Sequence, residues 1–227
     1  MGEPAIRAEG LGYSYPGGGP VIEGLSLELG KGSLLAVLGA NGSGKSTLLD
    51  LLAGLREPTS GKLEILPGGG ECRLLPQNVD YFLLGQTVGE EIGLSLAGLD
   101  KDARAREEER LASRWGFLGR LQEPVDSLSG GEKKRLAILG ALSGKPRALF
   151  LDEPFSGLDW EGSLALAGSL ASLREAGETV VLATHEPGLV KGFADVWLLL
   201  SRDRGHRLTS DQGELAGLLA EYKLRPL

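Results

Sequence analysis

Alternating apolar and polar residues predict strands in the N-terminal part of the chain. Leu25, Leu27 and Leu29 are separated by polar residues, which is the period of two typical of a half-buried strand. Leu63 and Ile65 repeat this alternation among charged neighbours. Continuous apolar runs, which are typical of buried strands, cover residues 33–38, 148–151, 180–183 and 196–200.

Helical patterns lie between these runs. Residues 100–115 form a charged, alanine-rich stretch with Asp100 in the N-cap position and Gly116 as a stop signal. Strands that alternate with helices imply a mostly parallel sheet, so we expect an α/β fold. Further helices are predicted over residues 46–55, 131–142 and 215–222.

The middle of the chain differs in character from its two ends. Residues 77–145 are mainly helical in pattern and lie between two strand-rich parts. We interpret them as a helical subdomain inserted into an α/β core that consists of residues 1–76 and 146–227.

Composition narrows the function classes. The 31 acidic and 24 basic residues among 227 give a net charge of −7, which argues against a nucleic-acid binder, since such domains are usually basic. The single cysteine, Cys72, excludes a disulfide within the chain and fits a reducing compartment. Apolar runs such as 196–200 are far shorter than the roughly 20 residues that span a bilayer, and no signal peptide is visible. A membrane role would therefore require a partner.

A glycine-rich loop follows the apolar run 33–38. Residues 39–47 read Gly-Ala-Asn-Gly-Ser-Gly-Lys-Ser-Thr and match the phosphate-binding pattern G-x-x-x-x-G-K-[ST]. Glycines let backbone N–H groups approach a triphosphate, and the next helix presents its positive N-terminal end. Lys45 adds a full charge for the outer phosphates, and the Ser46 hydroxyl is a candidate Mg²⁺ ligand. We predict that nucleotide is bound by Asn41, Gly42, Ser43, Gly44, Lys45, Ser46 and Thr47.

Two acidic residues follow the apolar run 148–151. In parallel sheets ligands bind at the carboxyl edge, so Asp152 is expected to reach Mg²⁺ directly or through water. Glu153 is placed to polarise a water for attack on the γ-phosphate. The alternative is that both acids belong to a solvated turn, and the phosphate-binding loop favours the first interpretation.

A third motif places the chain in a family. Leu128-Ser129-Gly130-Gly131-Glu132 stands before a basic helix, and here the chain resembles the ATP-binding cassette (ABC) ATPases, whose signature is L-S-G-G-[QE]. Other family motifs occur in the family's order over nearly the whole chain. These are Tyr15 for the aromatic that stacks on adenine, Gln77 for the glutamine loop, Ser156 to Asp159 for the D-loop, and His185 for the switch histidine.

The resemblance implies a fold, cofactors and partners. The fold is the P-loop ABC ATPase fold, with a mostly parallel core, an N-terminal antiparallel β part and an inserted helical subdomain. The cofactors are ATP and Mg²⁺, with Gln77 at the metal and Glu153 and His185 at the γ-phosphate. Two subunits, identical or different, pair head to tail, so that the signature of one closes on ATP held by the other. The signature contacts implied are Ser129, Gly130 and Gly131.

The chain is also similar to one subgroup of the family. Residues 77–80 and 87–91 look like the corresponding motifs of energy-coupling-factor (ECF) and cobalt or nickel importer ATPases. Three positions depart from that pattern: Val79 replaces a proline, Phe82 a glutamine, and Trp160 a proline.

Three functions are open. The first is the ATPase motor of a membrane transporter, located peripherally at the cytoplasmic face through transmembrane subunits and without nucleic acid. The second is a soluble ABC ATPase acting on nucleic acid, ribosomes or protein assembly, and the third is a regulatory module that does not hydrolyse ATP. Acidic charge and a single cassette favour the first over the second, and the intact motifs disfavour the third.

The sequence also predicts where three further groups of residues lie. Lys133, Lys134 and Arg135 are expected on a solvated helix face, and His206 in a surface loop. Residues 82–84, Phe-Leu-Leu, either line a groove for the membrane partner or belong to the core.

Overall fold

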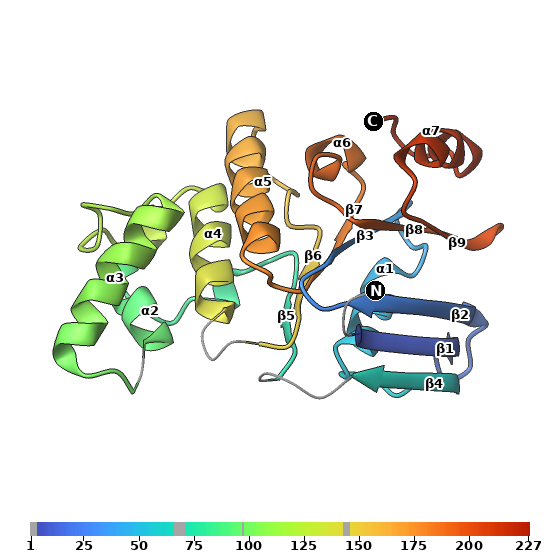
Figure 1. Cartoon of the computed structure of the whole chain (residues 1–227), viewed down its shortest axis with the longest axis horizontal. Coiled ribbons are helices and arrows are strands. Elements are labelled where there is room, and N and C mark those ends of the chain that lie inside the picture. Colours follow the sequence, from blue (N-terminus) through green and yellow to red (C-terminus); the bar gives the residue numbers. More distant parts are fainter. Residues whose placement is uncertain (1–3, 66–70, 97, 143–145) are drawn as a thin grey trace.

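A six-stranded sheet forms the centre of the computed structural model, which describes residues 4–65, 71–96, 98–142 and 146–227. Its strand order is β5-β6-β7-β3-β8-β9, and only β9 runs antiparallel to its neighbour (Figure 1). The predicted mostly parallel sheet is therefore confirmed. The strands are β3 (Leu34–Gly39), β5 (Arg73–Leu75), β6 (Leu149–Asp152), β7 (Val180–Thr184), β8 (Val196–Ser201) and β9 (Gly205–Thr209).

A second, antiparallel sheet of three strands comes mainly from the N-terminal part. Its order is β2-β1-β4, with β1 at Pro4–Ser14, β2 at Pro20–Gly30 and β4 at Ser60–Ile65. The alternation around Leu25 to Leu29 and around Leu63 falls in β2 and β4, as the sequence predicts.

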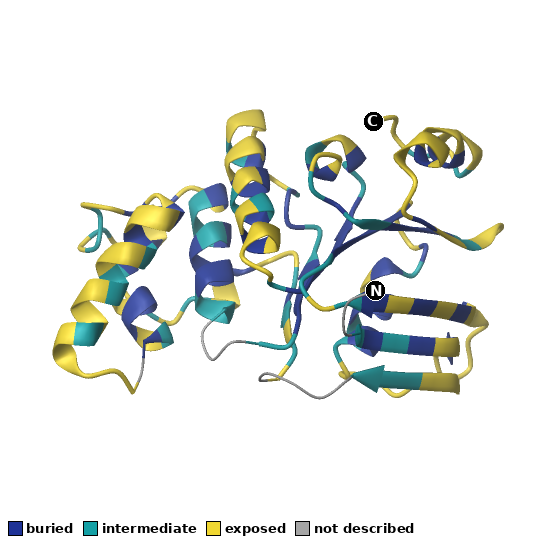
Figure 2. Ribbon diagram, viewed as in Figure 1, coloured by how far each residue is buried: buried dark blue, intermediate teal, exposed yellow. Residues whose placement is uncertain are grey.

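The central sheet lies between two hydrophobic cores because both faces of its middle strands are buried. In β3, Leu34, Ala36 and Leu38 face one core, while Leu35 and Val37 face the other. Helix α1 (Lys45–Leu52) and the antiparallel sheet close the second core. Figure 2 shows this middle layer as almost continuously buried.

The remaining helices cover the opposite face or extend beyond the sheet edge. Helix α3 begins after Asp100, whose carboxylate accepts hydrogen bonds from the N–H groups of Asp102 and Ala103, and ends at Gly116 with φ +79°, as predicted. Figure 1 places α2 and α3 at the opposite end of the molecule from β1, β2 and β4. The helices are α2 (Val88–Ser95), α3 (Lys101–Trp115), α4 (Gly130–Ala141), α5 (Trp160–Glu175), α6 (Pro187–Val190) and α7 (Gln212–Glu221), with single turns η1 (Asp80–Phe82) and η2 (Val125–Ser127).

Two expectations from the sequence are wrong. Lys134 is buried rather than solvated, and its ammonium donates a 2.6 Å hydrogen bond to the Ser156 carbonyl. His206 lies in β9 opposite Leu200, half-buried, and not in a loop. Burial lowers the pKa of both groups. Both errors have one cause, since charge predicts exposure only where no other element covers the side chain.

The 82–84 segment divides between the two alternatives. Phe82 and Leu84 are 45% and 79% exposed, whereas Leu83 packs against the core. No helix among the described residues is long and apolar enough to cross a bilayer.

Candidate functional site

The glycine-rich loop joins the end of β3 to the start of α1. Gly42 and Gly44 have φ values of +78° and +102°, a conformation that side chains rarely adopt. A Cβ on Gly44 would also come within 3.0 Å of Val21. Helix α1 has no side-chain cap and no acid in its first turn, so its N-terminal N–H groups can bind an anion.

Lys45, the first residue of α1, is buried and holds three oxygen contacts. Its ammonium donates to the carbonyls of Gly39 and Ala40 at 2.8 and 3.3 Å. It also lies 3.2 Å from Glu153 Oε1. These three contacts are all with oxygen atoms, and an ammonium held in this way can also bind phosphate oxygens.

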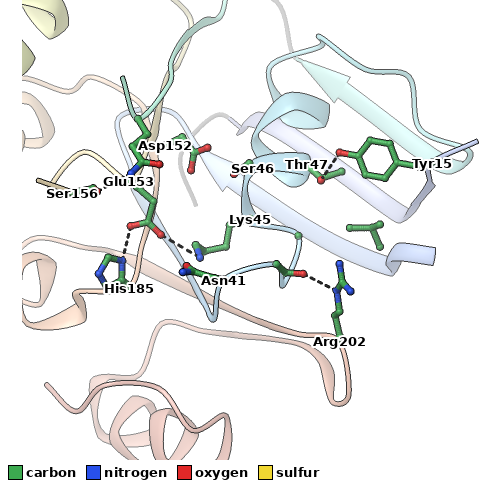
Figure 3. A pocket seen from close by; sticks show the side chains of 14 residues that line it. Tyr15, Asn41, Lys45, Ser46, Thr47, Asp152, Glu153, Ser156, His185 and Arg202 are labelled. Atoms are coloured by element: carbon green, nitrogen blue, oxygen red, sulfur yellow. Dashed lines mark hydrogen bonds and ion pairs between the residues drawn. The ribbon is translucent and has the colours of Figure 1, made fainter. Parts of the chain in front are cut away.

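The two acids after the apolar run lie at the end of β6. Glu153 has φ +47°, a strained value for a residue with a side chain, and strain of this kind occurs mainly at functional sites. Its Oε2 lies 2.8 Å from Nδ1 of His185, the residue after β7. Glu153 therefore contacts both Lys45 and His185 (Figure 3).

Asp152 is held in a less polar setting. Burial raises the pKa of its carboxyl, and a hydrogen bond from the Ser46 hydroxyl opposes that rise. Its buried Oδ1 has no hydrogen-bond partner among the described residues. An unpartnered, buried carboxylate oxygen beside a phosphate loop requires a cation or a water to satisfy it.

The aromatic residue is fixed at the other side of the same cavity. The Tyr15 hydroxyl lies 3.0 Å from Thr47 Oγ1, and the Arg56 guanidinium lies 5.2 Å from the centre of its ring. Tyr13 meets Tyr15 edge-on with ring centres 5.1 Å apart. Asp50 in turn holds Arg56 at 2.7 Å. These contacts orient the ring, so that it offers a fixed surface to a planar ligand.

One cavity of about 540 Å³ collects most of the residues that the sequence singles out. Residues of the loop, the β6 end and the β7 end share it, with Tyr15 far from His185 (Figure 3). Its lining residues are Tyr15, Val21, Asn41, Gly42, Gly44, Lys45, Ser46, Thr47, Gln77, Asp152, Glu153, Ser156, His185 and Arg202.

Two lining residues, Val21 and Arg202, are not among the candidates that the sequence gives. Arg202 donates a 2.7 Å hydrogen bond to the Gly42 carbonyl. Ser156, the first residue of the D-loop motif, accepts a 2.8 Å hydrogen bond from the Gln77 amide. Arg202 follows β8, which pairs in parallel with β3, so its strand ends at the same edge as the loop. The strand end is the signal that could have found it.

The signature residues lie outside this cavity. Ser129 caps α4 in a capping box with Glu132, and Ser129 and Gly130 are exposed. Gly131 is buried in the first turn. The cavity lining includes none of these three residues, so within one chain the start of α4 and the start of α1 face different surroundings.

Known proteins share this architecture. The family model described as ABC transporter matches residues 22–156. The chain is 41% identical to the cobalt import ATP-binding protein CbiO of Rhodobacter capsulatus, over 85% of this chain and 74% of that protein. It is 34% identical to the energy-coupling factor transporter ATP-binding protein EcfA of Methanosphaera stadtmanae, over 84% and 73%. The structure of cbiO1 from Clostridium perfringens superposes with a TM-score of 0.84 at 26% identity, over 97% of this chain and 94% of that one.

The chain therefore belongs to the ABC transporter family, as one of its ATP-binding proteins. It has the ABC ATPase fold and is an ATPase that serves transport. The resemblance to ECF and cobalt importer ATPases is confirmed by the relatives that carry those names.

Proposed function

We propose that this chain is the ATP-hydrolysing motor of an ECF or cobalt/nickel-type importer. One observation carries the proposal: Glu153 contacts both Lys45 and His185 in the cavity that Tyr15 also lines. One site thus contains a cation, a general base, a histidine for the γ-phosphate and an aromatic surface for adenine. The names of the relatives support the importer type, since one is a cobalt import protein and another serves an energy-coupling factor transporter.

The donor set suits Mg²⁺. Hard cations of this size take oxygen ligands, and the site offers the unpartnered Asp152 Oδ1, the Ser46 hydroxyl and the Gln77 amide oxygen. These three residues are the proposed metal ligands. Bound Mg²⁺ supplies positive charge that offsets the charge of the β- and γ-phosphates.

Glu153 is the proposed general base. It accepts a proton from a water whose oxygen bonds to the γ-phosphorus, while the bond from that phosphorus to the β–γ bridging oxygen breaks and ADP leaves. The phosphates compete with Glu153 for Lys45, which frees the carboxylate for the water. His185 donates a hydrogen bond to the γ-phosphate and orients Glu153. Glu153, His185 and Gln77 are thus the proposed catalytic residues.

Closure requires a second ATPase subunit, either a copy of this chain or a related one. Ser129, Gly130 and Gly131 form a helix start that is absent from the lining of the chain's own cavity. A partner's nucleotide can occupy it if the subunits pair head to tail. Binding of ATP then favours the closed dimer, and hydrolysis lets it reopen.

The helical segment 77–145 is the proposed signature subdomain, inserted between core parts 1–76 and 146–227. Its exposed Phe82 and Leu84 are the proposed contacts of a transmembrane subunit, because apolar side chains this exposed suit an interface. The chain would then sit peripherally at the cytoplasmic face of the membrane.

Two experiments test the assignment. A tagged chain, expressed with its neighbouring genes and extracted in detergent, is expected to co-purify with a membrane protein. Phe82→Ser with Leu84→Ser should weaken that association, whereas Leu118→Ser, at a leucine whose exposure lies between those of Phe82 and Leu84, should not. Purification with ribosomes or nucleic acid instead would support the soluble alternative. Absence of Mg-ATP hydrolysis by the assembled complex would support a regulatory module.

A further inference from the structure

A row of charged side chains continues from His185 away from the cavity. His185 Nδ1 faces Glu153, and its Nε2 lies 3.5 Å from Oε1 of Glu186. The same Glu186 oxygen is ion-paired with Nη1 of Arg225, close to the C-terminal end of the described chain. Each ring nitrogen of His185 therefore faces a carboxylate.

The C-terminal segment is held beside the residue that follows the switch histidine. Leu224 N–H donates a 2.8 Å hydrogen bond to the Leu219 carbonyl, and the Leu224 side chain packs against the main core. The backbone of Leu227 lies 3.7 Å from where a Cβ on Gly188 of α6 would be. Figure 1 shows this end of the chain next to α6 and α7. Packing, and not the ion pair alone, thus places Arg225 at Glu186.

One oxygen of Glu186, Oε1, faces both Arg225 and His185. The guanidinium of Arg225 is always charged, so it holds the Oε1 atom of Glu186 that faces His185. Nδ1 already faces Glu153 at 2.8 Å, so Glu186 acts on the other nitrogen, Nε2, which is the one left to reach a phosphate oxygen. The partner of one histidine nitrogen commonly determines what the other nitrogen can do.

We propose that Glu186 and Arg225 are positioning residues for His185. Arg225 holds the Glu186 carboxylate, and Glu186 holds the Nε2 side of the imidazole in place until the γ-phosphate takes over that contact. This inference rests on the proposed role of His185 in hydrolysis. It extends the site to the C-terminal segment, which lines no part of the cavity.

The kinetic test compares Arg225→Gln, Glu186→Gln and the double variant. Each single change is expected to lower kcat for ATP by roughly two- to fivefold, as for a part-exposed ion pair, with KM unchanged. The double variant should be no slower than the slower single one, because both residues act through one contact. Arg225→Lys should recover most of the rate. Arg204→Gln, which breaks a comparably exposed pair with Glu221 elsewhere, should have no effect.

A second readout is independent of turnover. The chain has two histidines, so ¹⁵N-histidine NMR resolves His185 with His206 as an internal control. In Arg225→Gln and Glu186→Gln the Nε2 signal of His185 should shift, because the carboxylate that faces this nitrogen is displaced or lost, and the His206 signals should stay. Melting temperature identifies a variant that fails to fold.

The two proposals fail differently. Wild-type turnover in His185→Ala would overturn the role of His185 in the proposed function. Slow turnover in His185→Ala, together with wild-type kcat and unchanged His185 signals in Arg225→Gln, would overturn only the positioning role. The positioning role would also be overturned if the losses of the two single variants added up in the double variant, because independent effects exclude a shared contact.

Discussion

Nδ1 of His185 lies 2.8 Å from Oε2 of Glu153, although 32 residues separate them in the sequence. The parallel pairing of β6 with β7 brings this about, because Asp152, the last residue of β6, lies opposite Ala183, and β7 ends at Thr184, directly before His185. The pair therefore stands at the carboxyl edge of the sheet, beside the phosphate-binding loop.

The Glu153→Gln variant tests whether Glu153 is the general base. Glutamine keeps size and hydrogen bonding but cannot accept the proton, so kcat should fall by about 10² to 10⁴. ATP binding should persist, and an ATP-bound dimer should accumulate because one negative charge near the γ-phosphate is lost. Size-exclusion chromatography with Mg-ATP measures this. Near wild-type turnover would remove Glu153 as the base, and a slow variant that never dimerises would count against closure with a second copy of this chain.

The Lys45→Ala variant tests the phosphate site. The buried ammonium has only oxygen partners, so its loss should weaken ATP binding about ten- to a hundredfold by calorimetry. Lys31→Ala, at an exposed lysine before β3, is the matched control and should bind ATP normally. Unchanged affinity in Lys45→Ala would contradict the assignment of this loop to phosphate.

The Ser129→Arg variant tests the composite site. Ser129 is exposed and outside the chain's own cavity, so ATP affinity of the monomer should change little. Turnover should be abolished because a bulky side chain blocks closure on a partner's nucleotide. Ser113→Arg, on the exposed face of α3, should hydrolyse ATP normally. Hydrolysis at the wild-type rate by Ser129→Arg would place the signature away from the nucleotide.

Tyr15 is expected to bind the adenine ring of ATP and not the phosphates. Tyr15→Ala should lose about five- to a hundredfold in ATP affinity, the range for one stacked base, while tripolyphosphate binding stays unchanged. Tyr15→Phe should retain most affinity, because it loses only the hydroxyl contact with Thr47. Calorimetry with both ligands separates the two effects. An equal loss for tripolyphosphate would mean that Tyr15 supports the loop instead.

The ion pair between Glu132 of the signature motif and Arg120 predicts how the stability of the fold depends on pH. A hydrogen bond from Arg120 at 2.5 Å is the main cause that lowers the pKa of its carboxyl from 4.5 to about 2. A lowered carboxyl pKa stabilises the fold above pH 4.5, and this contribution disappears as the pH falls through about 2. Glu132→Gln should therefore lower the melting temperature by about 1–4 °C at pH 7, with a difference that narrows toward pH 3. Glu109→Gln, at an exposed glutamate of α3, is the control. A gap that is constant with pH would exclude the ion pair as its cause.

The sequence by itself determined the features that depend on neighbouring residues. The phosphate-binding loop is nine consecutive residues, and glycine at 42 and 44 is required by positive φ values within that stretch. Helix starts at Asp100 and Ser129 follow from local capping. Runs of apolar residues likewise predict the four inner strands of the central sheet, β3, β6, β7 and β8, because burial on both faces leaves no polar position.

Only the tertiary structure decided which distant residues meet. Strand order brings Arg202 to the loop and His185 to Glu153, and this order depends on how all the strands pack, not on any local pattern. Lys134 shows the same limit, since a lysine is buried only because another segment supplies a carbonyl to its ammonium. The contact of Arg225 with Glu186 likewise exists because the C-terminal segment packs beside α6, a placement that no spacing along the chain encodes.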